Sequence, residues 1–235
     1  MERTEHARPS PPDGTWAVVP AFNEASAIAG TVAGIAAVGC RCIVIDDAST
    51  DPTAEHARRA GALVIRHAVN RGQGAALETG IRFCLGRGAR FIVTFDADGQ
   101  HDPADIGPLV APLVSGDAEI VLGSRFLGTA IDIPRSRLIA LKAAVLITRA
   151  SSGLAVTDTH NGLRAMSRRA AEAISFTVDR MGHASEILDQ IRQHGLRWTE
   201  APVTVRYTPY SRSKGQSSAM AVRSFVDYLA HRVFG

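Results

Sequence analysis

Short apolar runs alternate with alanine-rich, helix-like segments through the first 100 residues of the chain. The apolar runs are TWAVVPAF, CIVIDD, ALVIRH and FIVTFDAD, and the segments between them include PTAEHARRAG and GAALETGIRFCLGRG. This spacing is typical of parallel strands that are joined by crossover helices and buried on both faces. The alternation therefore predicts an α/β fold with a Rossmann-like first half, in which helices flank a mostly parallel central sheet.

Polar residues follow three of these strands at the point where each strand ends. They are Pro20, Asn23 and Glu24 after the first strand, Asp46 and Asp47 after the second, and Asp96 and Asp98 after the fourth. Because ligands of such sheets bind beyond the carboxyl ends of the strands, we expect the three clusters to converge on one site. The alternative is that the Asp and Asn side chains cap the helices that follow them.

The second half of the chain alternates less regularly. We expect a strand at AEIVLGSRF, then a basic, apolar helix, a turn and a helix across THNGLRAMSRRAAEAI, a helix at HASEILDQIRQHG and a strand at RWTEAPVTVRYTP. Near the end, apolar residues recur on one helical face, which predicts an amphipathic helix. These residues are Val222, Phe225, Val226, Leu229 and Val233.

A chain of 235 residues is long enough for one α/β domain and too short for two domains with a linker. Residues 1–14 carry three prolines, several charges and no apolar segment, so we expect a disordered tail rather than a signal peptide. Residues 15–235 are expected to form a single domain. It divides into a nucleotide-binding half (15–103), an acceptor half (104–218) and the C-terminal amphipathic helix (219–235).

Charge and cysteine content limit the classes of partner and compartment. The 26 basic residues against 23 acidic ones do not indicate nucleic-acid binding. Cys40, Cys42 and Cys84 cannot all pair within one chain, and we interpret them as reduced core thiols of a cytoplasmic protein. The longest apolar stretch, LIALKAAVLIT, is 11 residues long and contains Lys142, so it is predicted to lie on a bilayer at most and not to cross it.

The sequence Asp96-Ala97-Asp98 offers two carboxylates directly after an apolar strand. Carboxylate oxygens are hard ligands that suit Mg²⁺ or Mn²⁺. A metal ion at this position would bridge a diphosphate and neutralise the charge of a departing nucleotide. An isolated Asp-x-Asp triplet is a weak signal, but here it ends a strand and continues as GQHDP.

Together with the motifs VVPAFNEA, IDDASTDPT, NRGQGAALETG, DADGQHDP, GSRFL, DTHNGLRAMSRRA and EAPVTVRYTPYSRSKGQS, this segment resembles the family 2 glycosyltransferases. The resemblance runs from about Trp16 to Ser218 and is strongest to the branch of dolichyl-phosphate mannose synthase and the bacterial polyprenyl-phosphate glycosyltransferases. It implies a GT-A fold and the transfer of a sugar from a UDP- or GDP-sugar.

The resemblance also implies roles for individual residues on the donor side. Pro20, Phe22 and Glu24 would line the nucleotide pocket, and Asp47 or Asp46 would contact the base.

On the metal and acceptor side, Asp96, Asp98 and Gln100 would hold the metal ion and the diphosphate. Arg125, in GSRFL, would contact an anionic acceptor or the diphosphate, and Asp158, in TDTHNGLRA, would lie near the acceptor. Asp98, Arg125 and Asp158 are therefore the candidate catalytic residues. The alternatives are a solvated charge at Arg125 and a turn or helix cap at Asp158.

Two departures from the family pattern concern cationic residues. Gln73 occupies the position of a lysine that is frequent in the Asn-x-Gly-Lys-Gly stretch. The Arg-x-x-Gly-x-Ser motif is kept from Arg212 to Ser217, but Ser218 stands where a lysine usually follows. Lys214 is the candidate that replaces this lysine in binding the diphosphate.

The acceptor decides whether the reaction needs a general base. A lipid phosphate is already an anion, so positioning by arginines such as Arg125 and one of Arg135 or Arg137 would suffice. A saccharide hydroxyl would need Asp158 as a base within hydrogen-bonding distance. Attack opposite the leaving nucleotide inverts the anomeric centre with either acceptor.

Arg135, Lys142 and Arg149 recur every seven positions and form one basic stripe on the predicted helix, beside Leu138, Leu141, Val145 and Leu146. This pattern suits a helix on an anionic membrane surface, and equally a core-packed helix with a solvated face. With the resemblance, it favours a polyprenyl (dolichyl or undecaprenyl) phosphate acceptor and peripheral contact with the cytoplasmic face of the membrane.

Two other functions fit the sequence less well. A sugar-phosphate nucleotidyltransferase would carry a glycine-rich, basic loop after the first strand, and PAFNEAS is not such a loop. A nucleotide-sugar-binding module without turnover is disfavoured because Asp96, Asp98 and Gln100 are all present.

Overall fold

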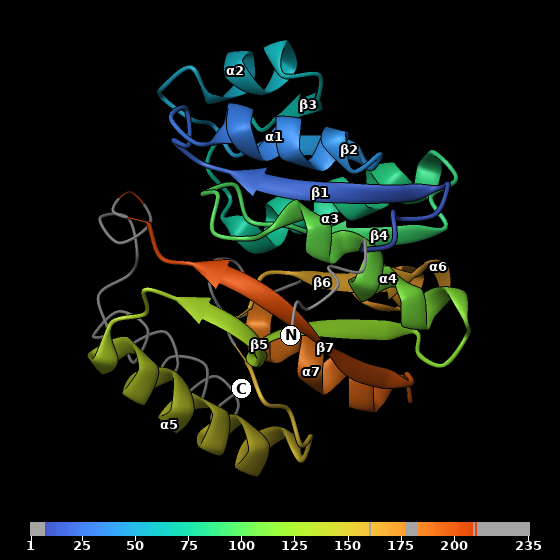
Figure 1. The fold of residues 1–235 in the computed structure, drawn as a ribbon. Helices are drawn as coiled ribbons and strands as arrows, with labels where there is room; N and C mark the ends of the chain where they lie inside the picture. The colour runs from blue at the N-terminus through green and yellow to red at the C-terminus, as the bar shows by residue number, and fades with distance from the viewer. Residues whose placement is uncertain (1–7, 160, 177–182, 209, 211–235) are drawn as a thin grey trace, which may run out of the picture.

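The computed structural model describes residues 8–159, 161–176, 183–208 and 210. Figure 1 shows the elements in chain order. They are β1 (Thr15–Ala21), α1 (Ile28–Ala37), β2 (Arg41–Asp46), α2 (Thr53–Arg59), β3 (Leu63–Arg66), α3 (Gln73–Gly86), β4 (Phe91–Thr94), a 3₁₀ turn (Pro103–Asp105), α4 (Ile106–Val114), β5 (Ile120–Ile131), α5 (Arg135–Ser152), β6 (Arg164–Ser167), α6 (Arg168–Ala173), α7 (His183–Gln193) and β7 (Trp198–Arg206).

The strands form one seven-stranded sheet in the order β3-β2-β1-β4-β6-β5-β7. Strands β1 to β4 pair in parallel, as do β5 and β7. Strand β6 is antiparallel to both of its neighbours, β4 and β5, and joins the two parallel blocks. The expected α/β class with a mostly parallel central sheet is thus confirmed.

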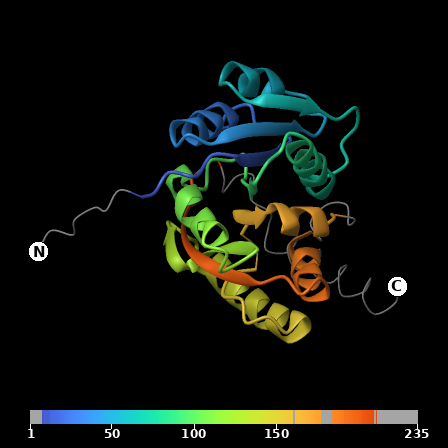
Figure 2. The same ribbon diagram turned by 90° about the vertical axis from the view of Figure 1, so that its right-hand side faces the viewer.

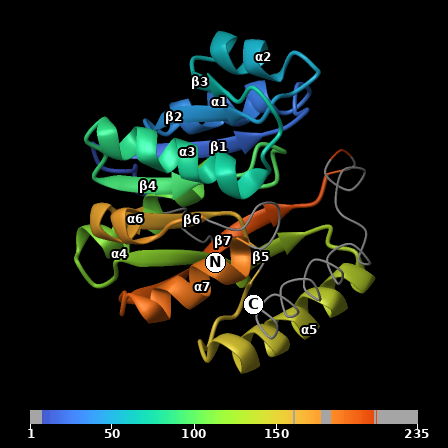
Figure 3. The ribbon, with the colours of Figure 1, turned by 180° about the vertical axis from the view of Figure 1, so that it is seen from behind.

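Helices cover both faces of the sheet, as Figure 2 shows. On one face, apolar side chains of α1 and α4 pack against alternate residues of the strands, with Ile28, Ile35 and Leu109 fully buried. On the other face, α3, α6 and α7 cover the sheet (Figure 3) and contribute residues such as Ile81 and Ile187. Burial on both faces explains why the strand sequences are continuous apolar runs.

The four residues of β6 were not predicted as a strand. The sequence predicts a turn and a helix in this region, and the structure has Arg164–Ser167 as a strand before the short helix α6. Its strand conformation comes from pairing with β4 on one side and β5 on the other. Such pairing between distant segments overrides local propensity, which is why this expectation was wrong.

Residues 8–14 also differ from the expected disordered tail, while residues 1–7 lie outside the described part. Arg8 forms an ion pair with Asp105, whose side chain is buried. A Cβ atom at Gly107 would overlap the carbonyl oxygen of Pro9, so the glycine in α4 permits this close approach. The packed part of the chain therefore begins before residue 15.

Helix α5 lies at the outer edge of the fold, beyond β5 and β7 (Figures 1 and 3). Val145 is buried, whereas Ile139 is 69% and Leu146 67% exposed. Leu146 therefore points outward, and the exposed residues Arg135, Lys142 and Arg149 lie beside a second, exposed apolar strip. No helix within the described residues has both the length and the apolar character needed to cross a bilayer. The predicted helix at 219–235 lies outside the described residues.

Candidate functional site

The Asp96-Ala97-Asp98 triplet follows β4 directly and lies at the carboxyl ends of β1 and β4, as the sequence predicts. The chain turns at Gly99, whose φ of 74° favours glycine. Asp96 Oδ2 lies 2.9 Å from Nε2 of His101, and Asp96 Oδ1 accepts a hydrogen bond of 3.3 Å from Gln73 Nε2. Asp98 accepts the N–H of Gln100 at 3.1 Å.

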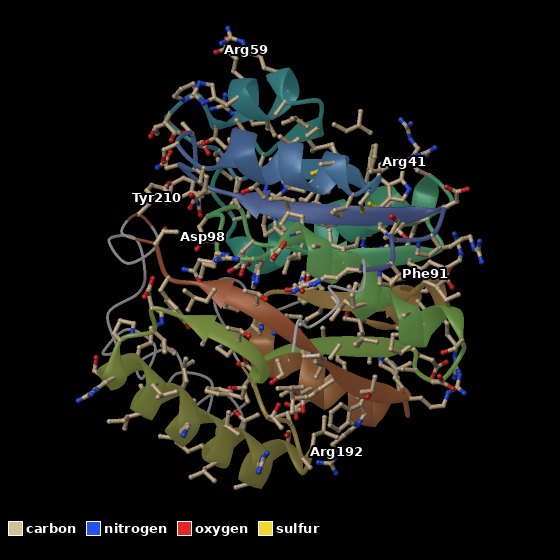
Figure 4. All side chains as sticks on the ribbon, in the orientation of Figure 1. Arg41, Arg59, Phe91, Asp98, Arg192 and Tyr210 are labelled. Atoms are coloured by element: carbon tan, nitrogen blue, oxygen red, sulfur yellow. The ribbon has the colours of Figure 1, made fainter. Side chains whose placement is uncertain are left out.

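Negative charge accumulates at this triplet. Burial, followed by the charges of Asp96 and Glu24, raises the pKa of Asp98 from 3.8 to about 6, although Gln100 N–H and His101 act in the opposite direction. Tyr210 donates a 2.7 Å hydrogen bond to Glu24, and Figure 4 shows Tyr210 on the same side of the sheet as Asp98. A cation at this position would offset the electrostatic cost of the carboxylates.

The chemistry of this pair of carboxylates fits a hard divalent ion such as Mg²⁺ or Mn²⁺. Among the described residues, no group of three or more Asp, Glu, His or Cys side chains is arranged to hold a metal ion. Asp96 and Asp98 would therefore supply part of a coordination sphere, and oxygens from a ligand would complete it.

The segments that follow β1 and β2 are hydrogen-bonded to each other at the carboxyl ends of these strands. Asn23 N–H donates to Ser49 Oγ at 2.9 Å, and Glu24 N–H donates to Thr53 Oγ1 at 2.8 Å. Pro20 is buried within β1, whereas Phe22 is 45% exposed. The loops thus bring Phe22 and Glu24 to the end of the sheet that carries Asp98, and the ring of Phe22 is accessible to a planar ligand.

Asp46 and Asp47 are both buried and both bound within the protein. Asp46 accepts the N–H of Ser49 at 3.1 Å and lies 3.2 Å from Arg66 Nε.

Asp47 lies 2.7 Å from His67 Nδ1 and accepts the backbone N–H groups of Arg71 and Gly72 at 2.9 and 2.7 Å. Its carboxylate therefore fixes the segment that leads into α3, a role that sequence reasoning did not anticipate. Contact of Asp46 or Asp47 with a base stays a prediction.

On the acceptor side, the structure brings two of the predicted residues together as a buried ion pair. Arg125 Nε donates to Asp158 Oδ2 at 2.6 Å, and the Arg125 backbone N–H donates to the same oxygen at 3.1 Å. Burial lowers the pKa of Arg125, but Asp158 and Tyr207 raise it by more, so the guanidinium stays charged. The structure thus pairs Asp158, the candidate base, with a permanent cation.

Neighbouring side chains fix this pair. Glu200 accepts the backbone N–H groups of Thr157 and Asp158 at 2.8 and 3.2 Å. Thr157 Oγ1 lies 2.6 Å from Ser124 Oγ, which links the middle of β5 to the loop before β6. The middle of β5 and the 157–158 loop are therefore held together by several hydrogen bonds.

Tyr207, which sequence reasoning missed, connects two of the predicted arginines. Its hydroxyl accepts a 2.5 Å hydrogen bond from Arg125 Nη1, and the guanidinium of Arg137 lies over its ring, 5.3 Å from the centroid. Arg135 begins α5 and is exposed. The motif VRYTP was a signal for this residue, since it places an aromatic side chain directly after β7.

The other predicted site residues divide by location. Gln100 lies beside Asp98, and its carbonyl oxygen accepts the N–H of Arg206 at 2.8 Å, so it is tied to the end of β7. Arg212 and Lys214 lie outside the described residues. His101 and Arg164 were not predicted, although both stand in quoted motifs, DADGQHDP and DTHNGLRAMSRRA.

Comparison with known proteins gives the family. Residues 16–175 match the sequence model described as "Glycosyl transferase family 2". An uncharacterised protein of Methanocaldococcus jannaschii is 36% identical over 94% of this chain and 93% of its own length. The polyprenol monophosphomannose synthase of Mycolicibacterium smegmatis is 30% identical over 83% of this chain and 78% of its own length.

A third relative is the UDP-N-acetylglucosamine–dolichyl-phosphate N-acetylglucosaminyltransferase of Methanococcus voltae, 29% identical over 91% of this chain and 94% of its own length.

Among solved structures, glucosyl-3-phosphoglycerate synthase of Mycobacterium tuberculosis in complex with Mn²⁺ and UDP-glucose superposes with a TM-score of 0.67. It is 22% identical and covers 93% of this chain and 78% of its own chain. This likeness, with the seven-stranded sheet, confirms the expected GT-A fold. The chain is thus a glycosyltransferase, and it belongs to glycosyl transferase family 2.

Proposed function

We propose that the protein transfers a sugar, with inversion, from a UDP- or GDP-sugar to a polyprenyl phosphate, and that the reaction depends on Mg²⁺ or Mn²⁺. The observation that carries the choice of acceptor is the buried ion pair between Arg125 and Asp158. A carboxylate held by a guanidinium is a poor proton acceptor, because the cation stabilises its charged form. An acceptor that is already an anion needs no such base.

The relatives support the same class of acceptor. Two of them carry dolichyl-phosphate and polyprenol monophosphomannose in their names. The fold neighbour is named for a phosphoglycerate product, so a soluble phosphorylated acceptor is the second candidate. A saccharide hydroxyl is the third, and it would require Asp158 to leave Arg125.

The roles of the donor-side residues follow from their positions. Phe22 and Glu24 border the nucleotide, and Asp46 or Asp47 contacts its base. Asp96 and Asp98, with Gln100 beside them, hold the divalent ion against the diphosphate. When bound, that ion would supply charge neutralisation to the leaving nucleotide. Lys214 and Arg212 would add cationic groups from the segment outside the described residues.

The acceptor-side residues position the incoming phosphate. Arg137 lies over Tyr207 in the first turn of α5, and Arg135, two residues earlier, is exposed. We assign the acceptor phosphate to one of these arginines together with Arg125, whose pairing with Asp158 fixes the geometry of its guanidinium. Attack by a phosphate oxygen opposite the leaving diphosphate inverts the anomeric centre.

Helix α5 provides the surface for the lipid. Its exposed strip around Ile139 and Leu146 lies beside Lys142 and Arg149. Apolar residues next to basic ones suit the headgroup region of an anionic bilayer, where each basic residue contributes about 1 kcal/mol. We therefore place the enzyme peripherally on the cytoplasmic face of the membrane.

The test is transfer of radiolabelled sugar to farnesyl phosphate, to farnesol and to 3-phosphoglycerate, with Asp98→Ala as the inactive control. The donor is selected beforehand by a thermal-shift panel of UDP, GDP and their sugars with Mn²⁺. Transfer to farnesyl phosphate alone supports the proposal. Equal transfer to farnesol, or transfer to 3-phosphoglycerate only, would refute it.

Membrane contact has its own test. Lys142→Glu should reduce co-sedimentation with phosphatidylglycerol vesicles, and rising salt should weaken the binding of the unaltered protein. Arg82→Glu, on the exposed side of α3, is the matched control for charge. Equal losses in the two variants would show that α5 is not the contact surface.

A further inference from the structure

Arg164 is a buried cation at the centre of the site. It begins β6, pairs in register with Thr94 of β4 and Leu122 of β5, and is 5% exposed. Its side chain shares a face of the sheet with Met166, because alternate residues of a strand point the same way. It therefore stands between β4, which is followed by the donor aspartates, and β5, which contains Arg125.

The guanidinium of Arg164 has attractive charges nearby but no direct partner. Among the residues that the structure describes, none forms a hydrogen bond or an ion pair with it. Burial lowers the pKa of Arg164 to about 10, against the attraction of Asp96 and Asp158. A buried charge without hydrogen bonds costs free energy, and such groups are retained where a ligand supplies the missing partner.

A second unsatisfied donor lies three residues before Arg164, in the loop that leads into β6. The Nδ2 group of Asn161 is buried and has no hydrogen-bond partner among the described residues, while its Oδ1 accepts the N–H of Leu163 at 3.0 Å. Because the Asn161 amide nitrogen and the Arg164 guanidinium are both hydrogen-bond donors, both missing partners are hydrogen-bond acceptors.

The loop itself is held rigidly beside the donor aspartates. The carbonyl oxygen of Gly162 accepts a 2.6 Å hydrogen bond from Thr94 Oγ1. A Cβ atom at Gly162 would overlap both carboxylate oxygens of Asp96, so the backbone lies directly against that side chain. The two unsatisfied donors are thus fixed between Asp96 and Asp158.

We propose that Arg164 and Asn161 bind a phosphoryl oxygen of the substrates, as a site distinct from Arg125, Arg135 and Arg137. An acceptor atom with full negative charge matches a guanidinium better than a neutral oxygen does, and phosphate oxygens match its planar fork. The site rests on the glycosyltransferase assignment and not on the lipid nature of the acceptor. The phosphoryl group belongs either to the leaving diphosphate or to the acceptor, since Arg164 lies between the two.

Calorimetric titration of variants tests the site and separates the two sources. The variants are Arg164→Met, Arg164→Lys and Asn161→Ala, with Arg82→Gln as the control that removes an exposed arginine from α3. The donor probes are UDP and GDP with Mg²⁺, and the acceptor probe is farnesyl phosphate. Arg164→Met should weaken binding of one probe class roughly tenfold to hundredfold, the factor that a charge-assisted hydrogen bond carries.

The pattern across variants identifies the bound group. Loss confined to UDP and GDP assigns Arg164 to the leaving diphosphate, and loss confined to farnesyl phosphate assigns it to the acceptor. Arg164→Lys keeps the positive charge but lacks the planar guanidinium. Its affinity for the probe should therefore lie between that of Arg164→Met and that of the unaltered protein. Asn161→Ala should weaken binding of the same probe class by a smaller factor. Arg82→Gln should leave binding of both the donor and the acceptor probes unchanged.

Thermal stability without ligand distinguishes binding from a structural role. Because Arg164→Met removes a buried cation without a direct partner, its melting temperature should not fall below that of the unaltered protein. A clear fall in melting temperature, or unchanged affinity for all three probes, would overturn the proposal. If Arg164→Met does not fold, that also counts against it, and Asn161→Ala then gives the independent measurement of the site.

Failure of this inference differs from failure of the proposed function. Sugar transfer to farnesyl phosphate by the unaltered protein, with unchanged binding in the Arg164 variants, would remove this site alone. Loss of phosphate binding in those variants without any transfer to farnesyl phosphate would keep the site and remove the polyprenyl acceptor.

Discussion

Replacement of Asp98 by Asn should stabilise the protein in the absence of metal. In the folded protein, burial and then the charge of Asp96 raise the pKa of Asp98 from 3.8 to about 6. The folded state therefore binds this proton more tightly than the unfolded state does. The stabilising contribution is complete below pH 3.8 and is lost as the pH rises through about 6.

The size of the effect follows from the same values. A rise from 3.8 to about 6 corresponds to about 3 kcal/mol of folding free energy, at about 1.4 kcal/mol per pKa unit. Asn cannot ionise, and its Oδ1 can still accept the N–H of Gln100. Asp98→Asn should therefore gain up to about 3 kcal/mol at pH 7.5, or roughly 6–12 °C in melting temperature, and nothing near pH 3.8.

Urea denaturation in EDTA at a series of pH values measures this difference directly, because the variant and the unaltered protein are compared at each pH. Asp13→Asn, which removes a carboxylate from an exposed position, should change stability by less than about 0.5 kcal/mol. With Mg²⁺ present and UDP at a thousandfold excess over its Kd, the order should reverse, because ligand binding then adds about 4.1 kcal/mol to the stability of the unaltered protein only. A variant that is no more stable at pH 7.5, or equally stabilised at pH 4, would refute the reasoning.

Three further predictions concern residues that hold the site together. Arg125→Met should destabilise the protein by about 3–5 kcal/mol because the buried Asp158 carboxylate loses its ion-pair partner. Arg125→Met with Asp158→Asn should recover part of this loss in a double-mutant cycle, and additive losses would show that the pair does not interact. Gly162→Ala should displace the Asp96 carboxylate and weaken UDP–Mg²⁺ binding, while the circular dichroism spectrum stays unchanged. An unaltered affinity in calorimetry would contradict the packing of the loop on Asp96. Asp47→Ala should weaken nucleoside diphosphate binding by roughly 1–3 kcal/mol. It should also lower the stability in urea, because two backbone N–H groups lose their acceptor. An unchanged unfolding midpoint would mean that the carboxylate does not support the start of α3.

The strands of the first half could be predicted because their signal is local. Each is an apolar run that ends in polar residues, and burial on both faces of a parallel sheet requires such runs. The same logic located Asp96 and Asp98 beyond a strand end, where the topology of a parallel sheet places ligand sites. Strand β6 escaped prediction because its four residues have no periodicity of their own, and two neighbouring strands decide its conformation.

The amino-acid sequence by itself determined the α/β class, the edge of the sheet where most of the candidate donor and metal residues gather and, through its motifs, the family. The tertiary structure alone decided which charged groups meet. Arg125 and Asp158 are 33 positions apart, and each was a candidate for a separate role until the fold placed them in one buried ion pair. Nothing in the local sequence marks Arg164 as a buried charge, because its burial arises only once β4 and β5 pair with β6 on either side. Pairing and desolvation depend on neighbours that are distant in the chain, which is the physical reason why a linear pattern does not reveal them.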